Sequence, residues 1–182
     1  MANSVENVYS TALFELCDEQ DTLDNTYEQL EQITQIIFDK QQKELALMLA
    51  SPLIPFADKQ KVLTGVFSEQ VSETVLDFLC VVTQKGRIRS LPAITEHFKQ
   101  MYYEKKNILE VTATTAMPMS ETLRKKLVDK LGKVSGKSII LHEKQDKSIL
   151  GGIVLRYGNT EIDSSVKSKL DKIKAQIDSA IV

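Results

Sequence analysis

Residues 146–170 read DKSILGGIVLRYGNTEIDSSVKSKL. Within this stretch the segment 149–157 is apolar and rich in β-branched residues, which predicts a strand. Gly158 and Asn159 follow it and supply the residues of a tight turn. The chain is therefore expected to reverse here into a short strand over 161–163, which makes the segment a β-hairpin.

Two adjacent glycines, Gly151 and Gly152, interrupt the predicted strand. Because glycine has no side chain, the pair indicates a bulge, or a place where a neighbouring helix or chain approaches the backbone closely. Too few polar residues surround the glycines for an anion-binding turn. We therefore interpret the pair as architecture, and we expect this part of the sheet to be the most open to a partner.

The rest of the second half alternates between strand and helix patterns. The segment 108–116 is β-branched with period two, and 138–143 reads as a second strand. Between them, Ser120 is a predicted N-cap for a helix. Asp163, Ser164 or Ser165 is expected to cap the last helix. The apolar stripe of that helix consists of Val166, Leu170, Ile173, Ile177 and Ile181.

The first 105 residues show the 3.6-residue apolar period of amphipathic helices. Six helices are expected, near 5–16, 23–37, 45–50, 55–67, 71–82 and 91–102. The fifth is apolar over more than half its circumference, which indicates a central position. The period changes near residue 106, so we predict a domain over 1–105 and a second over 106–182. The expected fold is α+β and mostly α: an N-terminal six-helix bundle, then a small C-terminal α/β domain with a short mixed sheet.

Composition excludes several classes of function. The formal net charge of −2 provides no basic field for a nucleic acid. Cys17 and Cys80 lie in apolar periodic stretches without CxxC spacing, so we expect buried, reduced thiols and a cytosolic protein. The chain shows no leader-like start and no apolar run near the ~18 residues of a membrane span, so direct membrane insertion is not expected.

Motifs for catalysis, metals and cofactors are not found. The segment 132–138, GKVSGKS, resembles a phosphate-binding loop but has three residues between its glycines where four are needed. A helix is also predicted to enter it and a strand to leave it, the reverse of the working order, so we interpret it as a helix end and turn. His97 and His142 are far apart and lack metal-ligand spacing. We expect no catalytic residue, metal or cofactor.

The opening stretch resembles the C-terminal signature of the ATP synthase delta subunit family, which includes the mitochondrial oligomycin sensitivity-conferring protein. The matching residues are Asp146, Ser148, Ile149, Leu150, Gly151, Gly152, Arg156, Gly158, Asn159, Ile162, Asp163, Ser165, Val166 and Lys167. The chain departs from the signature at Ser164, where the family usually has glycine, and at Ser168. Two further segments, YSTALF at 9–14 and KGRI at 85–88 followed by Leu91 and Pro92, are similar to family motifs in the same order.

This resemblance implies a non-catalytic stator subunit, present in single copy on the cytoplasmic face of a bacterial membrane. The helical bundle would bind the N-terminal helix of an alpha subunit, and the second domain would bind the C-terminal end of the b-subunit stalk. Our candidates for the alpha-binding groove are Tyr9, Ala12, Leu13, Leu16, Val75, Leu79 and Val82. Our candidates for the stalk-facing segment are Gly151, Gly152, Arg156, Gly158, Asp163 and Ser165, with the apolar face of the last helix.

Three alternatives stay open at this point. A small nucleotide-dependent enzyme would need ordered nucleotide binding at the loop 132–138, and a calorimetric titration with Mg-ATP that gives no heat would remove this alternative. The groove candidates would also fit a purely structural role, because a helical bundle buries most of its apolar stripes. A generic helix-binding adaptor outside the synthase would show the same amphipathic helices. Co-purification with alpha and b subunits separates an adaptor from a stator.

Overall fold

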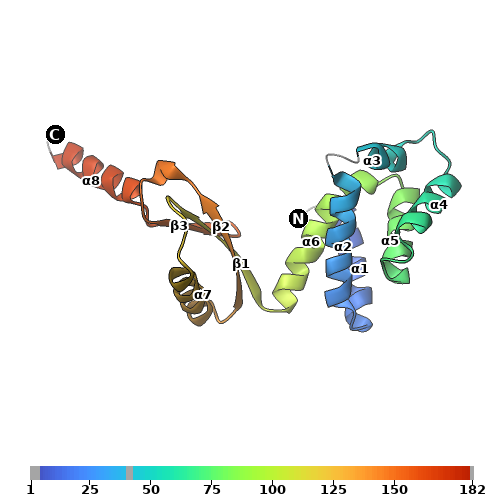
Figure 1. Cartoon of the computed structure of the whole chain (residues 1–182), viewed down its shortest axis with the longest axis horizontal. Helices are drawn as coiled ribbons and strands as arrows, with labels where there is room; N and C mark the ends of the chain where they lie inside the picture. Colours follow the sequence, from blue (N-terminus) through green and yellow to red (C-terminus); the bar gives the residue numbers. More distant parts are fainter. Residues whose placement is uncertain (1–4, 40–42, 181–182) are drawn as a thin grey trace. The chain divides into compact units, whose positions relative to one another are not determined.

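The computed structural model describes residues 5–39 and 43–180 of the 182-residue chain. The chain divides between Tyr102 and Tyr103 into two compact units. The described part is mostly helical, with a small mixed sheet confined to the second unit (Figure 1). This agrees with the fold class expected from the sequence.

The first unit is helical throughout the part that the structure describes. Its helices are α1 (Val5–Glu19), α2 (Leu23–Phe38), α3 (Lys43–Ala50), α4 (Phe56–Phe67), α5 (Glu73–Gln84) and α6 (Leu91–Lys105), with a short 3₁₀ turn η1 (Ile88–Ser90) before α6. Gly86 ends α5 in the left-handed conformation, φ +68°, which lets the chain turn into η1.

One hydrophobic core joins these helices. Every helix of the first unit and η1 contribute to it, and its fully buried side chains include Phe67, Phe98 and Leu30. Polar contacts then fix neighbouring helices: the Ser10 hydroxyl of α1 lies 2.6 Å from Nδ1 of His97 on α6. Burial of apolar surface is the main stabilising term for such a unit. The hydrogen bonds between helices fix how one helix is positioned along its neighbour.

The second unit contains a four-stranded sheet in the order β2-β1-β3-β4. Its elements are β1 (Ile108–Thr115), α7 (Glu121–Ser135), β2 (Ser138–Gln145), the 3₁₀ turn η2 (Lys147–Ile149), β3 (Ile153–Tyr157), β4 (Thr160–Asp163) and α8 (Val166–Ala180). β1 pairs with β2 in parallel and with β3 antiparallel, and β3 pairs antiparallel with β4.

Buried and half-buried side chains alternate along β1, and each set lies on one face of the sheet. Val111, Ala113 and Thr115 are buried on the face that α7 covers, whereas Thr112 and Thr114 are only half-buried on the opposite face. α7 lies against one side of the sheet, and α8 projects away from it (Figure 1). One face of the sheet is therefore open within this unit.

The hairpin that opened the sequence forms as predicted, with Tyr157 paired to Thr160 around Gly158 and Asn159. The predicted strand over 149–157 is too long, because β3 begins only at Ile153. The first part of that segment belongs to η2 and a turn, in which Leu150 has φ +63°. A strand cannot run through a residue with positive φ, so the glycine pair lies before the strand and not inside it.

Candidate functional site

A shallow groove of about 420 Å³ lies between α1 and α5 in the first unit. We call it the helix groove. α1 contributes one side of the groove and α5 the other. Its lining residues are Tyr9, Ala12, Leu13, Leu16, Thr74, Asp77, Phe78 and Val81.

The helix groove exposes apolar side chains that the core does not use. Leu16 and Val81 keep 42% and 44% of their surface accessible, while Leu13 is 3% exposed and forms part of the floor. Ala12 is exposed and small, so it leaves room above the floor. An exposed apolar groove of this kind, which no side chain of the same unit fills, is typical of a protein-binding surface.

The four residues predicted on the first helix, Tyr9, Ala12, Leu13 and Leu16, are brought together in this groove. The choice on the fifth helix is corrected, because Val75, Leu79 and Val82 are completely buried in the core. An incoming helix cannot reach these three side chains without unfolding the unit. The groove-facing side of α5 instead carries Thr74, Asp77, Phe78 and Val81, which follow the i, i+3, i+4, i+7 spacing of one helical face.

Tyr9 is held in place at the groove by Arg87, from the turn after α5. The Arg87 guanidinium donates a hydrogen bond to the Tyr9 hydroxyl at 3.2 Å and lies 5.3 Å from the centre of its ring. Phe78 packs edge-on against the same ring, with 6.4 Å between the ring centres. Sequence reasoning missed Arg87 as part of this site, although it belongs to the KGRI motif.

Asp77 is the one charged residue among the lining residues that the structure describes. Its charge acts on Cys80, whose pKa is raised first by burial of the thiol and second by the nearby Asp77 carboxylate. The groove thus combines an apolar floor with a single acidic side chain in its wall.

In the second unit, the glycine pair lets the turn before β3 cross the start of α8. Gly152 has φ +82°, and a Cβ built there would lie 2.6 Å from the Ser164 carbonyl oxygen. The Gly151 carbonyl accepts a hydrogen bond from the Val166 N–H at 2.9 Å. The expected close approach of a neighbouring helix is therefore confirmed, and that helix is the chain's own α8.

Asp163 and Ser165 form the cap of α8. The Asp163 carboxylate accepts a hydrogen bond from the Ser165 N–H at 2.8 Å, and the Ser165 hydroxyl accepts one from the Ser168 N–H at 3.1 Å. Hydrogen bonds from Ser165 to the Asp163 carboxylate, first from its backbone N–H and second from its side chain, lower the pKa of Asp163 below its ordinary 3.8. Both residues thus have a structural task at this helix start.

Arg156 lies on β3 opposite Glu161 of β4. Its Nε donates to the Glu161 carboxylate at 3.0 Å, and its terminal nitrogen also contacts that carboxylate. Gly158, with φ +52°, forms the adjacent turn. Arg156 and Glu161 are both largely exposed, so the pair lies on the surface of the hairpin and not in the core.

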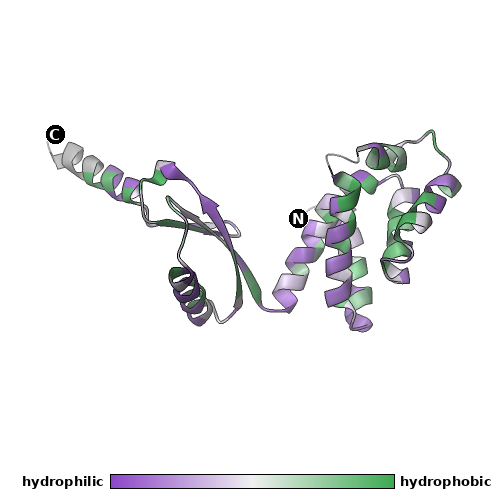
Figure 2. Ribbon diagram, in the orientation of Figure 1, coloured by the Kyte–Doolittle hydropathy of each residue, from purple (hydrophilic) through white to green (hydrophobic). Residues whose placement is uncertain are grey.

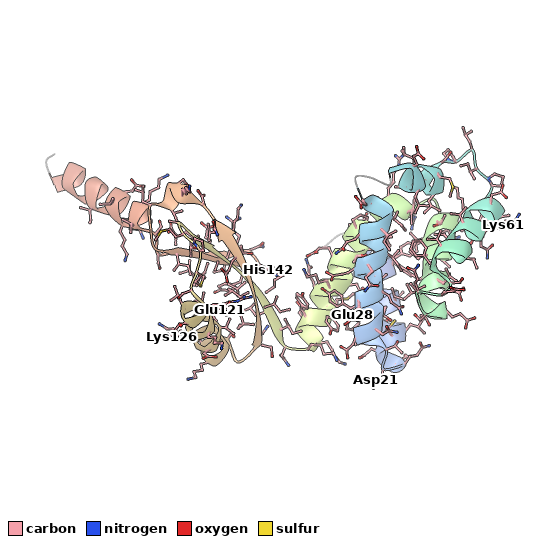
Figure 3. All side chains as sticks on the ribbon, viewed as in Figure 1. Asp21, Glu28, Lys61, Glu121, Lys126 and His142 are labelled. Carbon is pink, nitrogen blue, oxygen red and sulfur yellow. The ribbon has the colours of Figure 1, made fainter. Side chains whose placement is uncertain are left out.

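The open face of the sheet forms a second surface, a groove of about 720 Å³ that we call the sheet groove. Strand side chains on this face alternate with those under α7. Farther along the same face, His142, labelled in Figure 3, contacts Glu110 at 2.7 Å. The sheet groove is lined by Thr112, Thr114, Lys144, Asp146, Ser148, Ile149, Val154, Arg156, Glu161, Asp163, Ser165, Lys167, Ser168, Asp171 and Lys172.

Beside the sheet groove, α8 presents apolar residues to solvent. Val166, Leu170 and Ile173 are 43%, 53% and 52% exposed, and hydrophobic and hydrophilic bands alternate along this helix (Figure 2). The predicted stripe also included Ile177 and Ile181, which lie outside the residues described at the level of side chains. The exposed stripe and the sheet groove together form the stalk-facing candidate surface.

The remaining sequence motifs have structural explanations. The segment 132–138 is the end of α7 and the turn into β2, with Gly136 as the left-handed C-cap. Across residues 5–39 and 43–180, no group of three His, Cys, Asp or Glu residues is arranged to hold a metal ion. The helices of these residues are also too short or too polar to cross a membrane.

Comparison with known proteins gives consistent matches. The family model described as ATP synthase delta (OSCP) subunit matches residues 5–177. An ATP synthase subunit delta from Clostridioides difficile is 35% identical over 181 residues, covering 100% of this chain and 99% of that protein. One from Clostridium botulinum is 31% identical over 174 residues, 96% of each chain.

A solved structure shows the same fold. A chain in the cryo-EM structure of the Toxoplasma gondii mitochondrial ATP synthase hexamer matches with a TM-score of 0.75, over 96% of this chain and 97% of that one. The sequence identity is 21%, so this likeness concerns the fold alone.

Proposed function

Since the chain belongs to the ATP synthase delta (OSCP) subunit family, we propose that it is a non-catalytic peripheral-stalk subunit that links the catalytic head to the b-subunit stalk. The observation that carries this proposal is the helix groove, an apolar surface formed by α1 and α5 and unfilled within its unit. A protein with this task needs slow dissociation from two partners, one for each unit, and needs no chemistry of its own.

The first unit, proposed as the six-helix bundle of the family, would bind the N-terminal helix of the alpha subunit in the helix groove. An amphipathic helix binds such a surface through residues spaced i, i+3, i+4 and i+7. Covering the exposed halves of Leu16 and Val81 contributes about 1 kcal/mol each. Phe78, held against Tyr9, adds a rigid aromatic contact at low entropic cost.

The second unit would bind the C-terminal end of the b-subunit stalk. The exposed stripe of α8 provides apolar contacts, and the sheet groove provides charged groups of both signs beside it. In this proposal Gly151, Gly152, Asp163 and Ser165 position α8 and do not contact the stalk. Of the six residues predicted for the stalk-facing segment, Arg156 is the one proposed to meet the stalk through an exposed charged group.

These two contacts would place one copy of the chain on the synthase, at the cytoplasmic face of a bacterial membrane. It would resist the torque of the rotor during synthesis of ATP driven by protons or sodium ions. The generic adaptor discussed above would bind helices equally well, so the test must use the partner proteins of the synthase itself.

The test is calorimetric titration of the full chain with a peptide that spans the N-terminal helix of the alpha subunit from the same organism. We expect one-to-one binding with a negative heat-capacity change, the mark of apolar burial. Ala12→Arg should abolish binding while the far-UV circular dichroism stays unchanged, because Ala12 is exposed. Glu15→Arg, an exposed position of α1 that does not line the groove, is the control and should still bind.

Absence of binding by the folded wild-type chain would overturn the proposed role of the helix groove. Co-purification from the native membrane gives an independent check. Recovery of the chain with other proteins but without the alpha and b subunits would favour the adaptor.

A further inference from the structure

We infer that Asp77 is a specificity-determining residue of the helix groove, and that the helix bound there carries a lysine or arginine facing it. The inference rests on the proposed function of the groove and adds the charge that its partner must present. It concerns a residue that sequence reasoning did not select.

Asp77 lies where a helix bound in the groove would cover it. It lies on the groove-facing side of α5, three residues after Thr74 and four before Val81, with Phe78 next to it. Ala12 and Leu16 form the other side of the groove. A helix that covers these apolar residues therefore passes over the Asp77 carboxylate and removes water from it.

No charged group among the described residues compensates the charge of Asp77. Within the described residues, no Lys, Arg or His side chain forms an ion pair with it, and no side chain or backbone N–H donates a hydrogen bond to its carboxylate. Arg87, a basic residue that contacts the groove residue Tyr9, is engaged with the hydroxyl and the ring of that tyrosine.

These facts decide which helices fit. Burying an ionised carboxylate under an apolar helix costs several kcal/mol when no partner is supplied. A lysine or arginine in the bound helix offsets that cost, and its long aliphatic part can lie along the apolar wall before the charged end reaches Asp77. An amphipathic helix without a cation at this place, or with an acidic residue there, is rejected.

The experiment is a salt-dependent titration of the full chain with the same alpha peptide. Wild type and Asp77→Asn are compared, with Glu15→Gln as a matched loss of one carboxylate outside the groove. Asp77→Asn should weaken binding about 10-fold or more at low salt and should reduce the dependence of Kd on salt. Glu15→Gln should leave both unchanged.

A charge exchange identifies the partner residue. Each Lys and Arg of the peptide is changed in turn to Glu and titrated against wild type and Asp77→Lys. We expect one of these peptides to lose affinity for the wild type and to regain it with Asp77→Lys, giving a coupling energy between the two positions.

The outcomes separate the inference from the proposed function. Equal affinity and salt dependence for wild type and Asp77→Asn, with tight binding of both, would overturn the role of Asp77 and leave the groove as the binding site. Failure of the wild-type chain to bind any of the peptides would overturn the proposed function of the groove, and the inference with it.

Discussion

The backbone at Gly152 passes so close to Ser164 that a Cβ at position 152 would lie 2.6 Å from the Ser164 carbonyl oxygen and 3.0 Å from the Ser165 Cα. Both neighbouring atoms belong to the backbone at the start of α8 and cannot rotate away as a side-chain end can. The turn before β3 can therefore pack against the start of the last helix only because residue 152 has no side chain. The position of the exposed α8 stripe depends on this contact.

Replacing Gly152 with alanine should therefore destabilise the second unit. The new Cβ meets the Ser164 backbone, and φ +82° is itself unfavourable for alanine, so we expect a loss of about 2 kcal/mol or more. Hydrogen exchange of β3 and α8 amides measures it. Gly65→Ala is the control: it lies in α4 with nothing within 4 Å of its Cβ, and should stabilise its helix by about 0.5–1 kcal/mol. Unchanged exchange in Gly152→Ala would show that the turn relaxes freely.

Acid should loosen the start of α8. The folded-state pKa of Asp163 lies below 3.8, its ordinary value. The ionised carboxylate therefore stabilises the cap fully above pH 3.8, and this contribution is lost as the pH falls through the folded-state pKa. Amide exchange at Ser165 and Ser168, corrected for the intrinsic pH dependence, should show the loss.

Asp163→Asn keeps an oxygen that can accept the Ser165 hydrogen bond but no longer titrates, so the acid-dependent step should disappear. Asp171→Asn removes a carboxylate from the same helix away from the cap and should retain the step. If both variants behave like the wild type, another group controls the acid response.

Arg87→Ala should weaken binding of the alpha peptide without changing the stability of the chain appreciably. Arg87 is exposed, so its removal leaves the core intact, but Tyr9 loses both its hydrogen bond and its cation–π contact. A contribution of about 0.5–1 kcal/mol corresponds to an increase in Kd of about 2- to 5-fold. Titration calorimetry measures it. Arg89→Ala, exposed two residues later, is the control, and an equal loss there would mean that only the net positive charge matters.

The sequence predicts most of the fold because its strongest signals are local. Gly158 and Asn159 between two short strands specify the hairpin, and the Ser120 side chain caps α7 through the Leu123 N–H as expected. The strand predicted over 149–157 is longer than the observed one, because nothing in an apolar run of sequence reveals that Leu150 has a positive φ. That conformation belongs to the turn in which Gly152 meets Ser164, a contact between residues that are not neighbours in the sequence.

Only the α1 side of the helix groove could be predicted from the sequence; the α5 side could not. On α1 the apolar residues Tyr9, Ala12, Leu13 and Leu16 extend beyond the core stripe, so the groove side follows from the pattern. On α5 apolar residues occupy more than half of the circumference, and periodicity alone does not distinguish the core face from the groove face. Burial makes the distinction: Leu79 is fully buried, whereas Val81 is 44% exposed.

The last prediction concerns the proposed stalk surface on α8. Leu170 is 53% exposed in the middle of the described stripe, so replacing it with glutamine should leave the unit folded. In a complex with a peptide from the C-terminal end of the b stalk, however, Leu170 would be covered, and its loss should weaken binding about 10-fold. Lys169→Gln creates the same side chain one residue earlier, on another face of α8, and should bind like the wild type.

Full-length chain is titrated with the stalk peptide in each case. Weakening by Lys169→Gln but not by Leu170→Gln would indicate a charge-driven contact in place of the apolar one, because only Lys169→Gln removes a charge. Equal weakening by both variants would show that the effect is not specific to the apolar stripe. Unchanged affinity in Leu170→Gln would move the stalk contact away from this stripe.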